Sequence, residues 1–141
     1  MATSTYLSNP VVLVGSSSAA TTDITDQVSA VTVNYVVEAL EDTAFGSTAR
    51  TNTAGLQSNS ATLTLYASYA TSESYATLSA LVGTKCYIKV TPAAGSNTAT
   101  NPGFVLTNTF LSALPVVNAN LGELSTYDIE LVGGSYTVDV T

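Results

Sequence analysis

Acidic side chains are the residues of this chain best suited to chemistry. Glu38, Glu41 and Asp42 lie close together in the sequence and would suit a paired-carboxylate or cation site. Loops that bind hard cations, however, place oxygen ligands at alternating positions around a glycine, and this segment lacks that spacing. Asp23 and Asp26 are explained more simply as turn or capping residues. A solvated or partner-facing acidic loop is the favoured interpretation, and no metal ligands are predicted.

Covalent and acid–base catalysis require a base whose pKa lies near the working pH beside a nucleophile. The chain has no histidine and no glycine-rich phosphate-binding loop. Cys86 is the single cysteine, which excludes an intrachain disulfide. Its place in an expected strand favours a small buried apolar group over a reactive thiol. The sequence therefore predicts neither an enzyme nor a cofactor.

The charge inventory is unusually small. Only 9% of the residues are charged, against about 25% in ordinary soluble domains. Such a surface suits extensive contact with copies of the same chain, since the centres of interfaces are depleted in charge. Ten acids and three bases give a net charge of −7. This balance argues against nucleic acid as an attractive ligand, because phosphate binding needs clustered lysine and arginine. Repulsion of a passing polyanion stays open.

Length and hydropathy indicate one domain with a core of its own. We expect an N-terminal arm, short strand and loop over residues 1–22, followed by a β-sandwich domain over residues 23–141. No apolar run approaches the roughly 20 residues of a membrane span. The N-terminus also lacks the basic region and apolar segment of a signal peptide. We therefore expect synthesis in a cytoplasm and no membrane partner.

An alternating pattern predicts a long strand over Asp23–Leu40. Apolar or aromatic residues stand at every second position from 31 to 37, a period of two in β-branched and aromatic residues. The pattern stops after Leu40, and Glu41–Arg50 has no period and carries three of the chain's thirteen charged residues. Long charged loops of this kind usually function or are ordered by a partner. We interpret this one as a contact between subunits.

The rest of the chain predicts a mainly β fold, a β-sandwich or barrel with one flanking α-helix. Residues 52–59 are rich in turn formers, and Gly133-Gly134 is a two-residue turn of the hairpin kind. The helix is predicted over Thr71–Gly83, with Thr71 or Ser72 as its cap and Gly83 ending it in a left-handed conformation. Further strands are predicted at 10–15, 60–66, 84–91, 103–113, 124–132 and 136–140.

One long stretch carries a resemblance to a known family. DITDQVSAVTVNYVVEALEDTAFGSTARTNTAGLQSNSATLTLY, with the later TNPGF and LGEL, resembles small tail proteins of siphophages that infect actinobacteria, over roughly residues 23–132. The resemblance implies a major tail tube subunit, a virion protein with a β-sandwich flanked by a helix. It further implies hexameric rings whose inner strands join into one barrel and which stack into a tube. Expected partners are the chain itself and other phage tail proteins, with DNA as passing cargo.

Carried onto this chain, the resemblance makes the loop after the long strand the contact to a neighbouring ring. The strand itself would then contribute to the inner barrel. DNA carries about one negative charge per 1.7 Å of axis, so acids within a screening distance of about 8 Å would keep it from adhering to the bore. The implied contact residues are Glu41, Asp42, Thr43, Phe45, Gly46 and Arg50, and the candidate lumen acids are Glu38, Asp128 and Glu130.

The sequence is compatible with several other functions. A capsid decoration or cement protein would also be β-rich and poor in charge, and related folds serve as tail terminators and head-completion proteins. A carbohydrate-binding β-sandwich would expose aromatic platforms, for which Tyr35, Tyr87 and Tyr127 are candidates, although packing explains them better. A hydrolase is the least favoured reading.

Overall fold

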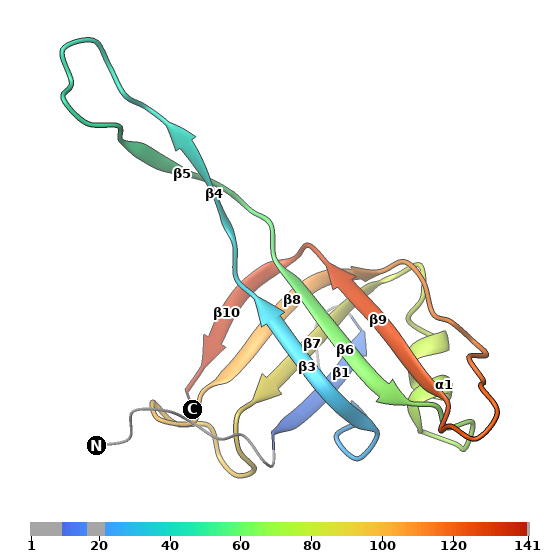
Figure 1. Cartoon of the computed structure of the whole chain (residues 1–141). Coiled ribbons are helices and arrows are strands. Elements are labelled where there is room, and N and C mark those ends of the chain that lie inside the picture. Colours follow the sequence, from blue (N-terminus) through green and yellow to red (C-terminus); the bar gives the residue numbers. More distant parts are fainter. Residues whose placement is uncertain (1–9, 17–21, 141) are drawn as a thin grey trace.

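The computed structural model describes residues 10–16 and 22–140 and shows an antiparallel β structure with one short helix (Figure 1). Eight strands form one sheet in the order β2-β1-β7-β8-β9-β6-β3, with β10 beside β8, and β4 and β5 form a separate pair. The predicted fold class is confirmed. The elements are β1 (Val11–Ser16), β2 (Thr22–Asp23), β3 (Val28–Asn34), β4 (Val37–Glu41), β5 (Asn52–Gln57), β6 (Ser60–Tyr66), α1 (Ser74–Ser79), β7 (Lys85–Thr91), β8 (Gly103–Leu111), β9 (Thr126–Val132) and β10 (Ser135–Asp139).

The large sheet folds over on itself at β8. One edge of β8 pairs with β7, and its other edge is shared: its start pairs with β10 and only its last residues, Phe110 and Leu111, pair with β9. In Figure 1, β3, β6 and β9 lie in front of β1, β7, β8 and β10. The apolar side chains that alternate along these strands meet between the two layers. This core includes Val12, Val14, Leu63, Leu65, Ile88, Leu106, Tyr127, Ile129 and Leu131.

The single strand predicted over Asp23–Leu40 is wrong. The chain turns at residues 24–27, runs as β3 to Asn34, and then changes partner: β3 pairs with β6, whereas β4 pairs with β5. Residues 52–57, predicted as turn-rich, form β5. A period of two reports which face of a strand is apolar, but it carries no information on where a strand changes its partner.

The helix is shorter than predicted and is not capped by Thr71 or Ser72. Glu73 takes the N-cap position without a side-chain hydrogen bond, and Ala80 ends the helix. Its start is fixed by contacts instead, because the Ser74 hydroxyl accepts a hydrogen bond from the Ser68 amide and donates one to the Tyr66 carbonyl. Gly83 does adopt a left-handed conformation (φ +79°), but beyond the helix, where its amide donates to the Leu111 carbonyl.

Gly133 and Gly134, predicted as a two-residue hairpin turn, both adopt positive φ values, of 76° and 91°. The strands on either side of them do not pair as a hairpin, however, since β10 pairs with β8. The glycine pair thus carries the chain from β9 to a different neighbour. A Cβ atom built on Gly134 would lie 2.4 Å from the Thr107 carbonyl oxygen, whereas one on Gly133 would meet nothing within 4 Å.

These contacts predict unequal effects of alanine at the two positions. Gly133→Ala should lower the free energy of unfolding by about 1–2 kcal/mol, the cost of a left-handed conformation for a residue with a Cβ. Gly134→Ala should lower the free energy of unfolding by about 1–3 kcal/mol more than Gly133→Ala, because the β8 backbone must move. Urea unfolding of both variants measures the difference, and equal losses would contradict the close approach.

Candidate functional site

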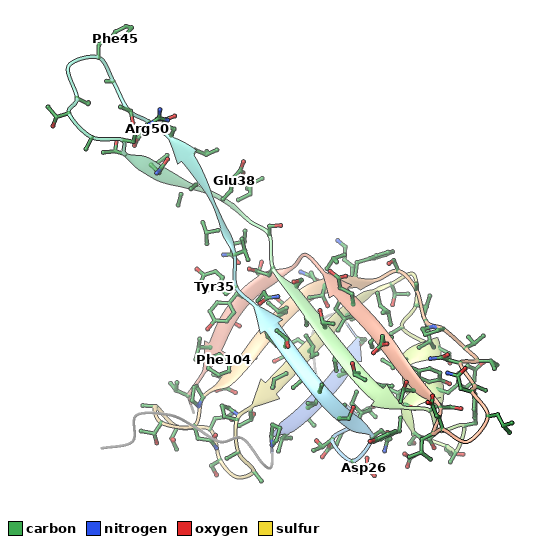
Figure 2. The ribbon with its side chains drawn as sticks, viewed as in Figure 1. Asp26, Tyr35, Glu38, Phe45, Arg50 and Phe104 are labelled. Carbon is green, nitrogen blue, oxygen red and sulfur yellow. The ribbon has the colours of Figure 1, made fainter. Side chains whose placement is uncertain are left out.

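The β4–β5 hairpin projects from the body of the molecule (Figure 2). Its strands pair only with each other, as at Leu40↔Thr53 and Glu41↔Asn52. Several large apolar side chains on it are exposed, among them Val37, Leu40 and Leu56. An isolated two-stranded hairpin is at best marginally stable in water. A projecting pair of strands with exposed apolar groups is therefore the strongest candidate for an interaction site in the described part of the chain.

The charged contact residues predicted from the sequence lie where the strands of the hairpin end. The Arg50 Nη1 atom lies 3.3 Å from Glu41 Oε1, an exposed pair worth at most about 1 kcal/mol. The Thr51 hydroxyl donates to Asp42 Oδ1 at 2.6 Å, and the Thr51 amide donates to the Thr43 hydroxyl at 2.8 Å. The polar groups at this neck are thus satisfied within the hairpin itself.

The tip beyond this neck, residues 43–49, contains no charged residue. Phe45 lies in it with its side chain fully exposed (109% relative exposure), at the far end of the molecule in Figure 2. Gly46 follows with a φ of +89°, a conformation that glycine adopts at no steric cost. The tip is therefore a small, uncharged turn that presents one large apolar side chain.

A buried amide, Asn59, holds the base of the hairpin. Its side chain is 2% exposed, and its Oδ1 atom accepts a hydrogen bond from the Val36 amide at 3.0 Å. Its Nδ2 group donates to Gln57 Oε1 at 2.7 Å and to the Gly134 carbonyl at 3.1 Å. The backbone carbonyl of Asn59 accepts a hydrogen bond from the Gly133 amide at 2.8 Å. One side chain thus joins both strands of the hairpin base to the turn between β9 and β10.

Two tyrosines support the same junction. The rings of Tyr35 and Tyr136 stack with centroids 4.1 Å apart and an angle of 14° between their planes. The Tyr136 amide also donates to Gln57 Oε1 at 3.1 Å. Neither Asn59 nor Tyr136 was singled out from the sequence. Tyr136 showed only the alternation of a strand, and Asn59 lies in a stretch where asparagine indicates nothing more than a turn.

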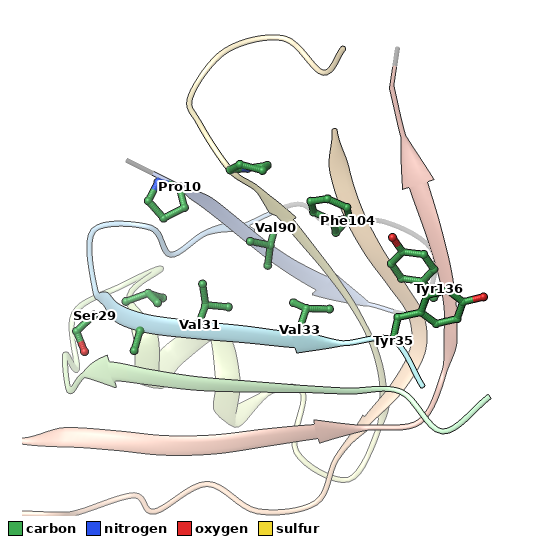
Figure 3. A pocket seen from close by; sticks show the side chains of 11 residues that line it. Pro10, Ser29, Val31, Val33, Tyr35, Val90, Phe104 and Tyr136 are labelled. Atoms are coloured by element: carbon green, nitrogen blue, oxygen red, sulfur yellow. The ribbon is translucent and has the colours of Figure 1, made fainter. Parts of the chain in front are cut away.

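An apolar groove of about 500 Å³ opens beside this base, between β3 and the layer of β7, β8 and β10 (Figure 3). Val31, Val33 and Tyr35 line it from β3 and the residue after it, and Val90, Phe104 and Tyr136 face them. None of the residues that line it is charged. The groove lies on the side of the molecule where the two layers are not joined by strand pairing. The apolar interior therefore reaches the surface here.

The predicted lumen acids do not form one cluster. Asp128 and Glu130 lie exposed on the outer face of β9, opposite Thr64 and Thr62 of β6. The Thr64 hydroxyl donates to Asp128 Oδ1 at 2.8 Å. Glu38 belongs to β4 of the hairpin, in the other sheet. Strands β3, β6 and β9 contain no lysine or arginine, so this outer face is polar and weakly acidic.

Cys86 and Tyr127 are titratable side chains that lie buried in the described core. Burial raises the pKa of the Cys86 thiol, whose Sγ atom lies against the Leu81 and Thr84 carbonyls, in keeping with the predicted apolar role. Burial, reinforced by the neighbouring Tyr69, raises the pKa of Tyr127, which is fully buried and unavailable as a ligand platform. Within residues 10–16 and 22–140, no three His, Cys, Asp or Glu side chains gather as a metal site would require. No helix there is both long and apolar enough to cross a membrane.

Comparisons with known proteins bear on the fold. No protein-family model and no curated protein matches the chain. Among solved structures, a chain of the PVC extracellular contractile injection system, in its extended sheath/tube terminator, is 14% identical over 96% of each chain, with a TM-score of 0.69. A chain of the extended PVC sheath–tube complex is 12% identical over 99% of this chain and 93% of that chain, with a TM-score of 0.65. The chain has a tail-tube-like fold.

A third similar structure is the tail of an empty gene transfer agent particle, determined with C6 symmetry. It is 13% identical over 92% of this chain and 95% of that chain, with a TM-score of 0.55. These identities establish architecture alone. Within this tail-tube-like fold, the residues predicted for subunit contacts lie on the hairpin and two of the predicted lumen acids lie on the sheet, and both roles remain predictions.

The Asn59 contacts predict that the hairpin loosens when the amide is lost. Asn59→Asp keeps the shape but replaces the Nδ2 donor by an oxygen that faces the Gly134 carbonyl and Gln57 Oε1. Leaving such buried groups unpaired should cost about 3 kcal/mol of unfolding free energy. Amide hydrogen exchange over Val37–Gln57 should accelerate.

Asn118→Asp is the matched control, because Asn118 is exposed and its Nδ2 group makes one hydrogen bond, to the Thr126 carbonyl. It should cost no more than about 1 kcal/mol and leave exchange in the hairpin unchanged. Equal effects of the two substitutions would show that Asn59 does not anchor the hairpin.

Proposed function

We propose that this chain is a structural subunit of a phage-type tail tube, in which copies form rings and the rings stack into a conduit for DNA. The observation that carries the proposal is the projecting hairpin on a tail-tube-like sandwich, since this element has no partner within the described chain. The similar structures come from tube-containing parts of injection systems and from a tail. The virion tail is the location that this function requires.

Free sheet edges support assembly into rings. Among the described strands, β3 pairs only with β6, and β10 pairs only with β8, so each has one unpaired edge. Exposed edges readily pair with other chains, and closing them between copies removes that hazard. We propose six copies in a ring, as in the C6 symmetry of the gene transfer agent tail. A siphophage tail is the setting that the sequence resemblance favours.

The outer face of β3, β6 and β9 is the surface that we assign to the bore. It carries Asp128 and Glu130, and these strands contain no lysine or arginine to hold a phosphate. We place Glu38 at the edge of the same surface, on the hairpin. Because screening limits repulsion to about 8 Å at physiological salt, acids at the wall are the ones that keep DNA moving.

A tail terminator is the second candidate, favoured by the similarity to a chain of the sheath/tube terminator structure. A terminator would form a ring that ends a tube, so a purified sample would contain single rings that do not extend. The two functions share the fold and the ring and differ in whether both faces of the ring accept another ring.

Electron microscopy of the purified protein tests the proposal. We expect stacked rings or tubes, because the chain would carry both halves of every contact. Single rings that do not stack at any concentration would favour the terminator. Monomers or discrete trimers would overturn both candidates and favour a decoration protein.

The bore assignment predicts a gain of DNA binding. In Asp128→Lys/Glu130→Lys, tubes should still form and should retain a fluorescent DNA duplex at low salt, with retention falling steeply as salt rises. The control Glu73→Lys/Glu123→Lys makes the same change of net charge outside strands β3, β6 and β9 and should retain far less DNA. Equal retention by both variants would argue against this face as the bore.

A further inference from the structure

The tip of the hairpin lies far from the groove at its base in the same chain. The chain from Tyr35, which lines the groove, to Phe45 spans on the order of 30 Å when extended at roughly 3.3 Å per residue. Figure 2 shows the two residues at opposite ends of the projection. Phe45 therefore cannot fill the groove of its own chain, although it can reach that of a neighbour.

The tip and the groove match in charge. Residues 43–49 are uncharged, and the nearest charges on the hairpin are satisfied locally, by the Glu41–Arg50 pair and the Thr51–Asp42 hydrogen bond. None of the residues that line the groove is charged. Burying an unpaired charge carries a large desolvation penalty. Seating the tip in the groove would avoid that penalty, because neither surface carries an unpaired charge.

The two surfaces also match in shape and kind. Phe45 is a fully exposed aromatic side chain on a protruding turn, and the groove is a recess of about 500 Å³. Tyr35, Phe104 and Tyr136 supply aromatic walls to the groove. Aromatic rings that pack against one another stabilise a contact by more than their buried area alone would give. Aromatic anchors seated in central pockets carry much of the energy of protein interfaces.

Building on the proposed function, we propose that Phe45 of one copy inserts into the groove between β3 and the layer of β7, β8 and β10 of a second copy. Donor and acceptor are different surfaces of one chain, so the contact is heterologous: each copy gives one phenylalanine and receives another. Contacts of this type close into rings or propagate as filaments. The groove thereby becomes the receptor that orders the hairpin, and the reach of about 30 Å sets the spacing between copies.

Disulfide trapping tests the contact directly. The double variant Val33→Cys/Phe45→Cys places one thiol in the groove and one on the tip. Mild oxidation of assembled protein should give a ladder of covalent multimers on a non-reducing gel, because every copy carries a donor and an acceptor. Cys86 is 1% exposed and should not compete. Either single variant should give dimers at most.

Two further variants keep the test decisive. Phe45→Cys/Leu121→Cys pairs the tip with another fully exposed apolar position, in the loop between β8 and β9, and should give no ladder. A ladder from this pair, with none from Val33→Cys/Phe45→Cys, would overturn the proposal. Phe45→Ala should weaken association about thirtyfold, the effect of losing a hot spot, while the circular dichroism of the monomer stays unchanged.

The outcomes separate this inference from the proposed function. If the unmodified protein forms neither rings nor tubes, the tube function fails. If tubes form, the groove–tip disulfide does not appear, and Phe45→Ala assembles like the unmodified protein, the tube function stands and the docking of Phe45 is wrong.

Discussion

The arrangement of this molecule depends on one buried amide. Asn59 bonds to the Val36 amide where the hairpin leaves the sheet, to Gln57 where it returns, and to the glycine turn between β9 and β10. A two-stranded projection has no core, so its direction must be set at its base. The buried Asn59 side chain sets this direction through hydrogen bonds. Apolar packing would not do the same, since hydrogen bonds fix geometry as well as contact.

The course of β8 explains why a groove exists beside the hairpin base. One edge of β8 pairs with both β10 and β9, so the sheet bends there. On the opposite side of the molecule, no backbone hydrogen bonds of strand pairing join the two layers. The partly buried side chains Val31, Val33 and Tyr136 pack against the core from this open side. The same topology thus produces the hairpin, the recess and two free strand edges within a short distance of one another.

Charged side chains are few in this chain, and most of the basic ones are paired with an acid. Lys89 pairs with Asp139 at 2.9 Å, and Arg50 pairs with Glu41, which accounts for two of the three basic side chains. The acids of β9 face outward on strands without bases. Strands without bases offer little to hold a polyanion, and interface centres are depleted in charge, so this distribution is compatible with the proposed tube.

The sequence by itself determined the faces of the strands and the sites of tight turns. Leu63 and Leu65, and Tyr127, Ile129 and Leu131, alternate with polar residues and are buried, because the side chains of any strand alternate between its two faces. Gly133 and Gly134 adopt positive φ because glycine lacks a Cβ atom. The exposure of Asp128 and Glu130 and the burial of Cys86 followed from the same local rules.

Only the tertiary structure decided which strands pair. The change of partner between β3 and β4, the pairing of β10 with β8, the late start of α1 and the role of Asn59 each depend on groups distant in the chain. Alternation is a property of a few consecutive residues, and it is identical whichever neighbour a strand has. Partner choice is instead fixed by the packing of the whole core and by hydrogen bonds over long sequence separations, so the hairpin base and the groove appear only when the chain is folded.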